Sequence, residues 1–175
     1  KLTGGKISIN TRNNHFKLGK SSGAGIKVYS GGKISGECTQ KDIGSNHADI
    51  PKYKVVSNEM LGYAFFFDKD GKILGSPDYK VLNPGIVCSS HYCVYRSFNN
   101  KREADSLVSY LNTKLIRFIT ALTLTGTTTS KQEFWRFVPD PGALDHIFTD
   151  QELYTKYGLS DDEVKLIESV IKARK

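Results

Sequence analysis

The spacing of apolar residues changes near residue 100, and this change constrains the fold more than any other feature of the chain. Before it, apolar residues occur in short β-branched and aromatic runs separated by Gly, Ser and Asn, which predicts strands and turns. After it, apolar residues recur at steps of three and four, which predicts amphipathic helices. A chain with strands first and helices afterwards is typical of an α+β fold.

Short segments before residue 100 have the composition of β-strands, because they are rich in β-branched and aromatic residues and are bounded by turn residues. The sequence Asp68-Lys69-Asp70-Gly71 separates two of them and predicts a hairpin turn. Its resemblance to part of a calcium loop is incomplete, since the third acidic position and the distal Glu are missing. The predicted strands cover residues 6–10, 25–29, 53–56, 63–67, 72–74, 86–88 and 92–95.

From residue 100 onward the apolar residues form a helical stripe that predicts one long buried helix. Asn100 followed by Glu103 is a capping arrangement at its start. The stripe ends at Thr123, and the polar run 125–130 predicts a loop. Residues 111–114 are interpreted as a tight break or packing feature of this scaffold. The stripe consists of Leu107, Tyr110, Leu111, Leu115, Phe118, Ile119 and Leu122.

The end of the chain predicts a small helical tail. Thr149 with Glu152 and Ser160 with Glu163 have the spacing of capping boxes, and Gly158 is placed to end the first of the two short helices. We therefore expect an α+β fold in which a β-rich, basic N-terminal part packs on one long helix, followed by a small helical C-terminal tail. Residues 149–175 are expected to be an extension of the domain formed by residues 1–148.

The distribution of charge favours a polyanionic partner. The formal net charge is +7, but residues 1–131 carry 19 Lys and Arg against 9 Asp and Glu, a net of +10, whereas residues 132–175 carry 6 against 9, a net of −3. A basic body with an acidic tail suits nucleic acid binding by one part of the molecule. A soluble domain that happens to be basic is the alternative.

The sequence also indicates the cellular compartment in which the protein is expected. It contains neither a run of 18 apolar residues nor a charged and then apolar leader, so we expect no membrane span and no signal peptide. Three cysteines cannot form a disulfide framework, which indicates a reducing, cytoplasmic compartment. The chain begins with Lys1 and is expected to be a fragment of a longer protein.

Two patterns imitate metal sites. Cys88 and Cys93 flank His91, but a structural zinc needs four closely spaced ligands, and on one extended strand the two cysteines would point to opposite faces. We interpret them as buried reduced thiols. Residues 139–140 with residues 163–165 imitate a nuclease motif, but capping explains Glu163. With no nucleotide-binding or nucleophile motif present, we expect no catalytic residue, metal or cofactor in this chain.

The loop of residues 10–20 is the candidate for contact with DNA. Arg12 can pair with guanine, and Asn13 and Asn14 can pair with adenine. Lys side chains in the same loop can neutralise phosphates, and the polar loop near residue 130 is a second candidate contact. The predicted DNA-binding residues are Arg12, Asn13, Asn14, His15, Lys17, Lys20, Thr128 and Lys131. A solvated polar loop is the alternative interpretation.

One region resembles a known family. The resemblance runs from about Gly85 to the end and rests on residues 95–100, 103–104, 107–114, 117–118, 134–140, 149–154 and 157–160, with Glu163, Ile167, Glu168 and Ile171. Together they resemble the C-terminal part of bacterial restriction–modification proteins of the adenine-specific DNA methyltransferase type, including combined type II endonuclease–methyltransferase chains. The first 84 residues match only loosely, as expected if they carry variable sequence readout.

The resemblance implies a DNA target-recognition domain over residues 1–148. In that family the methyl-donor pocket and an Asn-Pro-Pro-Tyr motif precede this region, and Asn83-Pro84-Gly85 lacks the second Pro and the aromatic residue, so no catalysis is carried over. The partners it implies are double-stranded DNA and an N-terminal methyltransferase domain of the same parent chain. S-adenosylmethionine would belong to that parent domain, which would flip out and methylate an adenine.

Two other classes of function remain open. The acidic tail could bind a basic partner protein, which would make the chain a protein-interaction module. The chain could also hold an unrecognised Mg²⁺-dependent nuclease. Binding that weakens steeply with salt indicates a DNA reader, whereas a flat response to salt indicates an apolar protein interface.

The two kinds of predicted contact lead to different losses of affinity. We expect Arg12→Ala to cost about 1–3 kcal/mol on the cognate site and little on random DNA. Lys20→Ala should weaken binding to both and lower the salt slope by about one. The measurement is binding and methylation by the full-length parent enzyme at cognate and altered sites. If Arg12→Ala, Asn13→Ala and Asn14→Ala all preserve site preference, the readout lies elsewhere, such as in residues 31–49.

Overall fold

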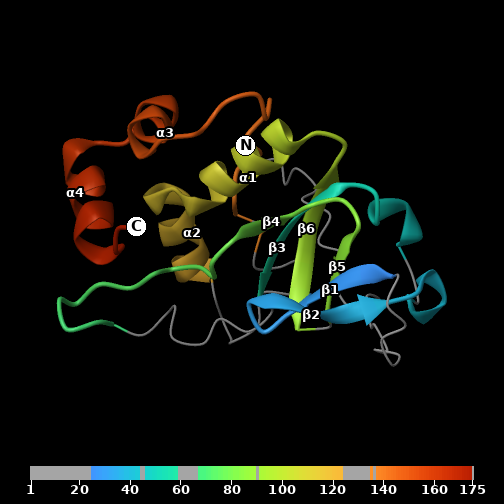
Figure 1. The fold of residues 1–175 in the computed structure, drawn as a ribbon. Helices are drawn as coiled ribbons and strands as arrows, with labels where there is room; N and C mark the ends of the chain where they lie inside the picture. The colour runs from blue at the N-terminus through green and yellow to red at the C-terminus, as the bar shows by residue number, and fades with distance from the viewer. Residues whose placement is uncertain are drawn as a thin grey trace.

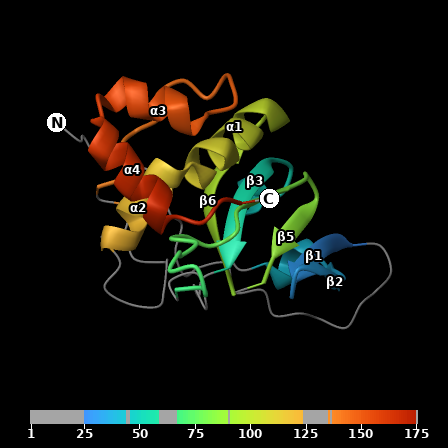
Figure 2. The same ribbon diagram turned by 90° about the vertical axis from the view of Figure 1, so that its left-hand side faces the viewer.

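Two three-stranded sheets and a group of helices form three layers in the computed structural model, which describes residues 25–43, 46–58, 67–89, 91–123, 135 and 137–174. Figures 1 and 2 show the helices on one side of β3 and β6, and β1 and β2 on the other side. The expectation of an α+β fold is confirmed.

The first sheet has the order β2-β1-β5, with β1 (Ile26–Ser30), β2 (Lys33–Cys38) and β5 (Ile86–Cys88). Strand β1 is antiparallel to β2 and parallel to β5. The second sheet has the order β4-β3-β6, with β3 (Tyr53–Asn58) antiparallel to both β4 (Lys80–Leu82) and β6 (Tyr92–Phe98). Two short 3₁₀ helices, η1 (Gln40–Asp42) and η2 (His47–Asp49), connect the sheets.

Four of the predicted strands are confirmed, since residues 25–29, 53–56, 86–88 and 92–95 coincide with β1, β3, β5 and β6. Strands β2 and β4 were not expected from the sequence. Strand β2 reads Lys-Ile-Ser-Gly-Glu-Cys and is mostly exposed at a sheet edge, so it lacks a clear apolar alternation, and β4 is only three residues long. The predicted strand at 6–10, and that at 63–67 except for Phe67, lie outside the described residues.

Residues 68–71 form a turn, but the hairpin that the sequence predicts around it stays a prediction on its first side, since residues 63–66 lie outside the described residues. The Asp68 carboxylate accepts the backbone N–H groups of Asp70 and Lys72, each at 2.9 Å, and Gly71 takes a left-handed conformation. The prediction of a strand at 72–74 is wrong. Ile73 instead makes an isolated parallel bridge with Ile171, because its backbone N–H and C=O bond to the end of the chain.

Strand β3 separates two layers of core by simple alternation. Val55 belongs to the large cluster formed with the helices, whereas Val56 packs with Tyr29 and Cys88 of the first sheet. Strand β6 divides its side chains in the same way, with Tyr95 toward the helices and Val94 toward the first sheet. The second sheet is therefore the middle layer of the molecule, covered on both faces.

The single long helix that we expected is wrong, because the structure has two helices, α1 (Lys101–Asn112) and α2 (Lys114–Thr123). Thr113 between them is extended, at φ −60° and ψ 149°, and its hydroxyl donates to the Tyr110 carbonyl at 2.7 Å. The Asp150 carboxylate accepts the backbone N–H of Lys114, so a side chain from another helix satisfies the start of α2. The break noted at residues 111–114 is therefore real.

The tail contains α3 (Asp150–Tyr157) and α4 (Asp161–Val170), and their predicted caps are confirmed. Thr149 and Ser160 accept the N–H of Glu152 and Glu163, although only Ser160 completes a reciprocal box. Gly158 ends α3 in the left-handed conformation, at φ 65°. Side chains of α3, α4 and the residue after α4 enter the large cluster with the middle sheet: Leu153, Tyr154, Ile167 and Ile171.

A buried arginine joins three segments that are distant in sequence. The Arg117 side chain is 1% exposed, and its guanidinium donates to the carbonyls of Asn112 at 2.9 Å, Leu74 at 3.0 Å and Lys172 at 2.8 Å. Burial lowers the pKa of this guanidinium to about 10. The backbone of Gly75 passes close to the backbone of Arg117, since a Cβ there would lie 2.6 Å from the Arg117 carbonyl oxygen.

Removing this guanidinium should destabilise the fold strongly. We expect Arg117→Met to lower the free energy of unfolding by about 3 kcal/mol or more, because three carbonyls lose the donor that the buried side chain supplies. Urea denaturation followed by circular dichroism measures the change. The control is Arg102→Met, which removes an exposed guanidinium bonded to one carbonyl and should cost less than about 1 kcal/mol. Equal losses in the two variants would contradict the joining role of Arg117.

Candidate functional site

The residues that the sequence nominated for DNA contact lie outside the described part of the chain, so their positions stay predictions. They are Arg12, Asn13, Asn14, His15, Lys17, Lys20, Thr128 and Lys131. The described residues form a different candidate, a hollow beside the turn that joins β1 and β2. Sequence reasoning did not find it, because its walls come from four strands that are not adjacent in sequence.

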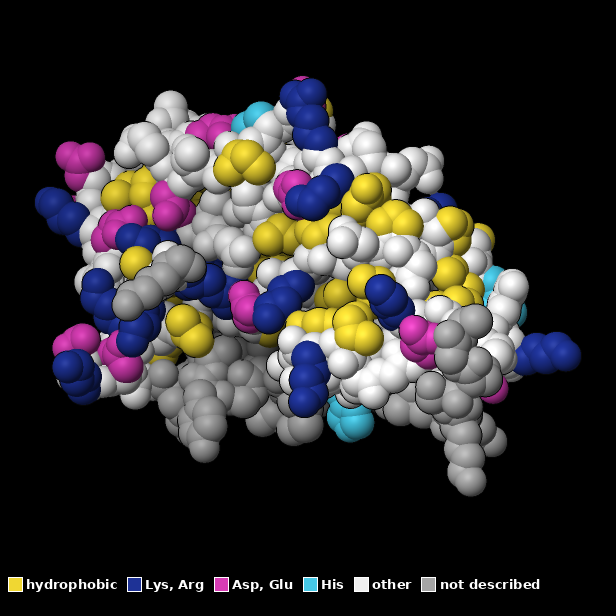
Figure 3. Space-filling view, in the orientation of Figure 1, with side chains coloured by type: hydrophobic (Ala, Val, Ile, Leu, Met, Phe, Trp, Pro, Cys, Tyr) yellow, Lys and Arg dark blue, Asp and Glu magenta, His cyan; other side chains and the backbone are white. Residues whose placement is uncertain are grey.

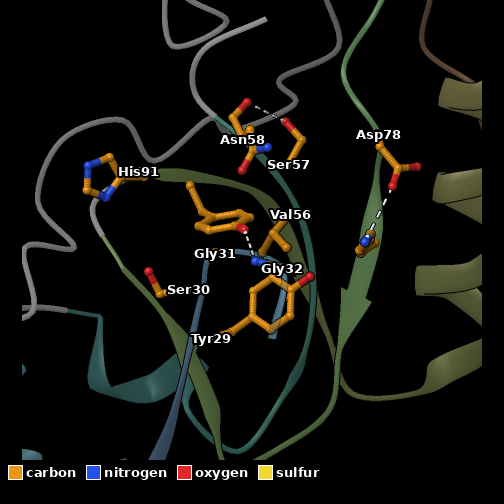
Figure 4. A pocket seen from close by; sticks show the side chains of 11 residues that line it. Tyr29, Ser30, Gly31, Gly32, Val56, Ser57, Asn58, Asp78 and His91 are labelled. Carbon is orange, nitrogen blue, oxygen red and sulfur yellow. Dashed lines mark hydrogen bonds and ion pairs between the residues drawn. The ribbon is translucent and has the colours of Figure 1, made fainter. Parts of the chain in front are cut away.

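The hollow has a volume of about 550 Å³ and lies where the two sheets meet. Its lining comes from the end of β1, the turn after it, the end of β3, the start of β6 and the region of β4. Figure 4 shows His91 and Asp78 at opposite sides, with Ser57 and Asn58 along the side between them. The hollow is open to solvent through exposed residues such as His91 and Asn58.

Two tyrosines form a fixed aromatic wall. The rings of Tyr29 and Tyr92 meet edge to face, with centroids 5.2 Å apart and planes at 64°. The Tyr92 hydroxyl accepts the backbone N–H of Gly32 at 3.0 Å. Gly31 and Gly32 have φ values of 58° and 82°, which a two-residue hairpin turn of this kind requires and which glycine adopts without strain. The glycine pair therefore directs the N–H that holds Tyr92.

The hollow is lined by one lysine and one acidic side chain, Lys80 and Asp78, whose opposite charges offset each other. Lys80 lies 3.5 Å from the Asp78 carboxylate, and both side chains are well exposed. The pKa of Lys80 is raised, chiefly by its electrostatic interaction with the Tyr29 hydroxyl and further by Asp78. Lys80 is consequently an ammonium group at neutral pH. It places a hydrogen-bond donor beside a carboxylate acceptor at the edge of an aromatic wall.

The three cysteines are buried and form no disulfide. We expected Cys88 and Cys93 on one extended strand, which is wrong, because they belong to β5 and β6 and a turn separates them. Burial raises the pKa of the Cys88 thiol to about 12, so this thiol is protonated and unreactive at neutral pH. Within the described ranges, no group of three His, Cys, Asp or Glu side chains is arranged to hold a metal ion.

Local hydrogen bonds account for Asp140 and Glu163, the two carboxylates of the nuclease-like pattern. The Glu163 carboxylate accepts the backbone N–H and the hydroxyl of Ser160, both at 2.8 Å, and these bonds lower its pKa. The Asp140 carboxylate accepts the N–H of Gly142 at 2.9 Å in a turn. Capping therefore explains Glu163 as the sequence predicted.

Lys54 resembles a functional residue in its burial and its hydrogen bonds, and no sequence pattern singled it out. Its side chain extends from β3, is 3% exposed, and donates to the carbonyls of Asp49 at 3.0 Å, Ile50 at 3.2 Å and Lys52 at 2.6 Å. Burial lowers its pKa to about 8. Because its three donors are engaged by carbonyls at the end of η2 and in the segment between η2 and β3, we assign Lys54 to the structure of the connection between the sheets.

The surface cations of the described residues fall into two groups. On the helical side Lys101, Lys114, Lys165 and Lys172 each pair with a carboxylate. On the first sheet and η1, the exposed Lys27, Lys33 and Lys41 have no ion-pair partner among the described side chains. Figure 3 shows acidic side chains interspersed with Lys and Arg over the helical end of the molecule. Arg102 and Lys156 of the helical side bond to backbone carbonyls instead. Lys27, Lys33 and Lys41 thus form a group of exposed cations on the β-rich side.

Comparisons with protein-family models, with curated proteins and with solved structures found no match to this chain. The helices that the structure describes include none that is long and apolar enough to cross a membrane.

The depressed pKa of Lys54 predicts a pH dependence of stability. Between pH values of about 8 and 10.5 the folded protein has lost the Lys54 proton while the unfolded chain still binds it, so the free energy of unfolding rises with pH. Compared with Lys54→Met, the wild-type protein should gain up to about 1.4 kcal/mol per pH unit in this window. The Cys88 thiol, whose pKa is raised, has the opposite slope in both proteins and largely cancels in the comparison.

The measurement is urea denaturation of both proteins across this pH window. Two stability curves that stay parallel from pH 8 to pH 10 would show that the amine is not desolvated as its burial implies.

Proposed function

We propose that this chain binds double-stranded DNA as the target-recognition domain of a restriction–modification enzyme. The parent enzyme would be an N6-adenine DNA methyltransferase, possibly fused to an endonuclease. The observation that carries the proposal is a group of exposed cations on the first sheet and η1: Lys27, Lys33 and Lys41 lack carboxylate partners among the described residues, whereas four lysines of the helical side are paired. Unpaired Lys side chains are the groups that neutralise DNA phosphates.

The amino acid composition of the N-terminal residues also favours the β-rich side as the surface that binds DNA. Residues 1–24, which lead directly into β1, contain five Lys and Arg and no Asp or Glu. They include the loop with Arg12, Asn13 and Asn14, whose side chains can pair with base edges. The charge of the N-terminal segment and that of the first sheet would add to one binding surface.

The β1–β2 hairpin has the shape that suits DNA. Two antiparallel strands joined by a two-residue turn form a ribbon, and the major groove of B-DNA admits such a ribbon. Among the described strands, β2 lies at the edge of its sheet, and its first half is exposed at Lys33, Ile34 and Ser35. We propose that this ribbon contacts the duplex, with Lys27 and Lys33 on phosphates.

The helical side would serve as scaffold and as the surface turned away from DNA. Its acidic side chains are occupied by caps and ion pairs, as for Glu163 and Glu168. The resemblance of residues 85–175 to the family described above supports the same division. The methyl donor and the methyltransferase domain would come from the parent chain, and the described residues would contribute binding and orientation only.

Salt dependence tests the proposal. We expect binding of the 175-residue chain to a fluorescein-labelled duplex, measured by anisotropy, to weaken steeply between about 50 and 200 mM salt. The double variant Lys27→Ala and Lys33→Ala should reduce the salt slope by about two, one for each lost phosphate contact. Lys165→Ala is the matched control, because it removes an exposed Lys that pairs with Asp162 on the helical side.

Other outcomes identify the alternatives. Binding of protein partners with no dependence on salt, together with no binding of DNA, would favour the protein-interaction module. Cleavage of the duplex that requires Mg²⁺ would establish a nuclease. Transfer of a labelled methyl group to DNA by this chain alone would contradict the assignment of catalysis to another domain.

A further inference from the structure

We propose that the hollow beside the β1–β2 turn is a subsite for one unpaired nucleotide of the bound DNA. The inference rests on the proposed DNA-binding function and adds a ligand class to a site that no motif in the sequence indicates. It is argued from the size of the hollow, its aromatic wall and the pair of polar groups at its edge.

The size of the hollow and its aromatic wall favour a ligand that contains a planar ring. A volume of about 550 Å³ exceeds what a single inorganic ion fills and lies in the range of small-molecule sites. The Tyr92 ring is held by the Gly32 N–H and by its edge contact with Tyr29, so it does not need to be ordered when a ligand arrives. Nucleobases stack on such rings with little dependence on base identity.

The polar groups match the edge of a base. Lys80 offers a donor and Asp78 an acceptor, 3.5 Å apart at the border of the hollow. Every nucleobase carries an adjacent acceptor and donor on its Watson–Crick edge, so the pair can bind any base. That edge is occupied when a base is paired in the duplex. The site therefore selects a nucleotide that has left its partner.

The charge of the lining argues against a bare anion. Asp78 lies beside Lys80, so a phosphate placed at the ammonium would also meet the carboxylate. A base is uncharged and can use both groups. Its phosphate would lie at the rim, where His91 is exposed and where Lys33 follows the Gly31-Gly32 turn.

The location agrees with the binding surface proposed above. The hollow opens beside the tip of the hairpin that would contact the duplex, and Gly31 and Gly32 line it. A strand that follows the hairpin would pass this opening. The hairpin and the hollow would thus act on the same DNA molecule.

The test compares two labelled duplexes that differ only by one extra, unpaired deoxyadenosine. We expect the wild-type chain to bind the bulged duplex about tenfold more tightly than the paired duplex, within the range expected from one base–aromatic stack. Tyr92→Leu, or Lys80→Met combined with Asp78→Ala, should remove the difference. Tyr92→Phe keeps the ring and should retain most of it.

Lys27→Met is the matched control, because Lys27 is exposed on the same sheet but does not line the hollow, so its loss should weaken binding to both duplexes equally and leave the tenfold ratio in place. Circular dichroism and thermal unfolding show whether each variant folds, and the double change at Asp78 and Lys80 removes exposed side chains only. Equal binding of the two duplexes by the wild-type chain would overturn the proposal for the hollow while leaving the DNA-binding function intact. A preference that survives in folded Tyr92→Leu and in the double variant would also overturn it.

Two further outcomes concern the source of the nucleotide. Failure of both duplexes to bind would overturn the DNA-binding function and the subsite together. Displacement of the bulged duplex from the wild-type chain by micromolar deoxyadenosine monophosphate would show that free nucleotide is the occupant and would overturn the assignment to DNA.

Discussion

The arrangement of the helical side depends on the hydrogen bonds that the Arg117 guanidinium donates. This group donates to carbonyls from the end of α1, from the segment after the 68–71 turn and from the segment after α4. The guanidinium itself is buried, and a carbonyl that loses its donor in such surroundings is costly. One side chain on α2 therefore aligns parts of the chain that are up to 55 residues away from it.

The middle sheet connects the helical side to the first sheet, because both pack against it. Its strand β3 has Val55 against the helices and Val56 against the first sheet, so both layers pack on the same backbone. Lys54, one residue earlier, binds the carbonyls at the end of η2 and fixes the connection between the sheets. The hollow lies at the end of this same strand, next to Ser57 and Asn58. A site between two sheets depends on both layers being held.

The structure also separates side chains that stabilise from those that remain available to a partner. Carboxylates of the tail are engaged in caps and ion pairs, and the amine of Lys54 and the thiol of Cys88 are buried. Lys27 and Lys33, together with Lys80 and His91 at the hollow, are instead exposed on the β-rich side. The proposed function draws on these exposed side chains, and the proposed nucleotide subsite combines them with the Tyr92 ring that the fold holds in place.

The sequence alone determined what depends on near neighbours along the chain. Asn100, Ser160 and Gly158 cap helices, and Asp68 closes its turn, because each acts within about one helical turn. Tertiary contacts decided the rest. Asp150 starts α2 from another helix, Ile171 takes Ile73 as its strand partner, and the walls of the hollow meet only when two sheets stack. These outcomes depend on partners distant in sequence, which periodicity and propensity cannot specify.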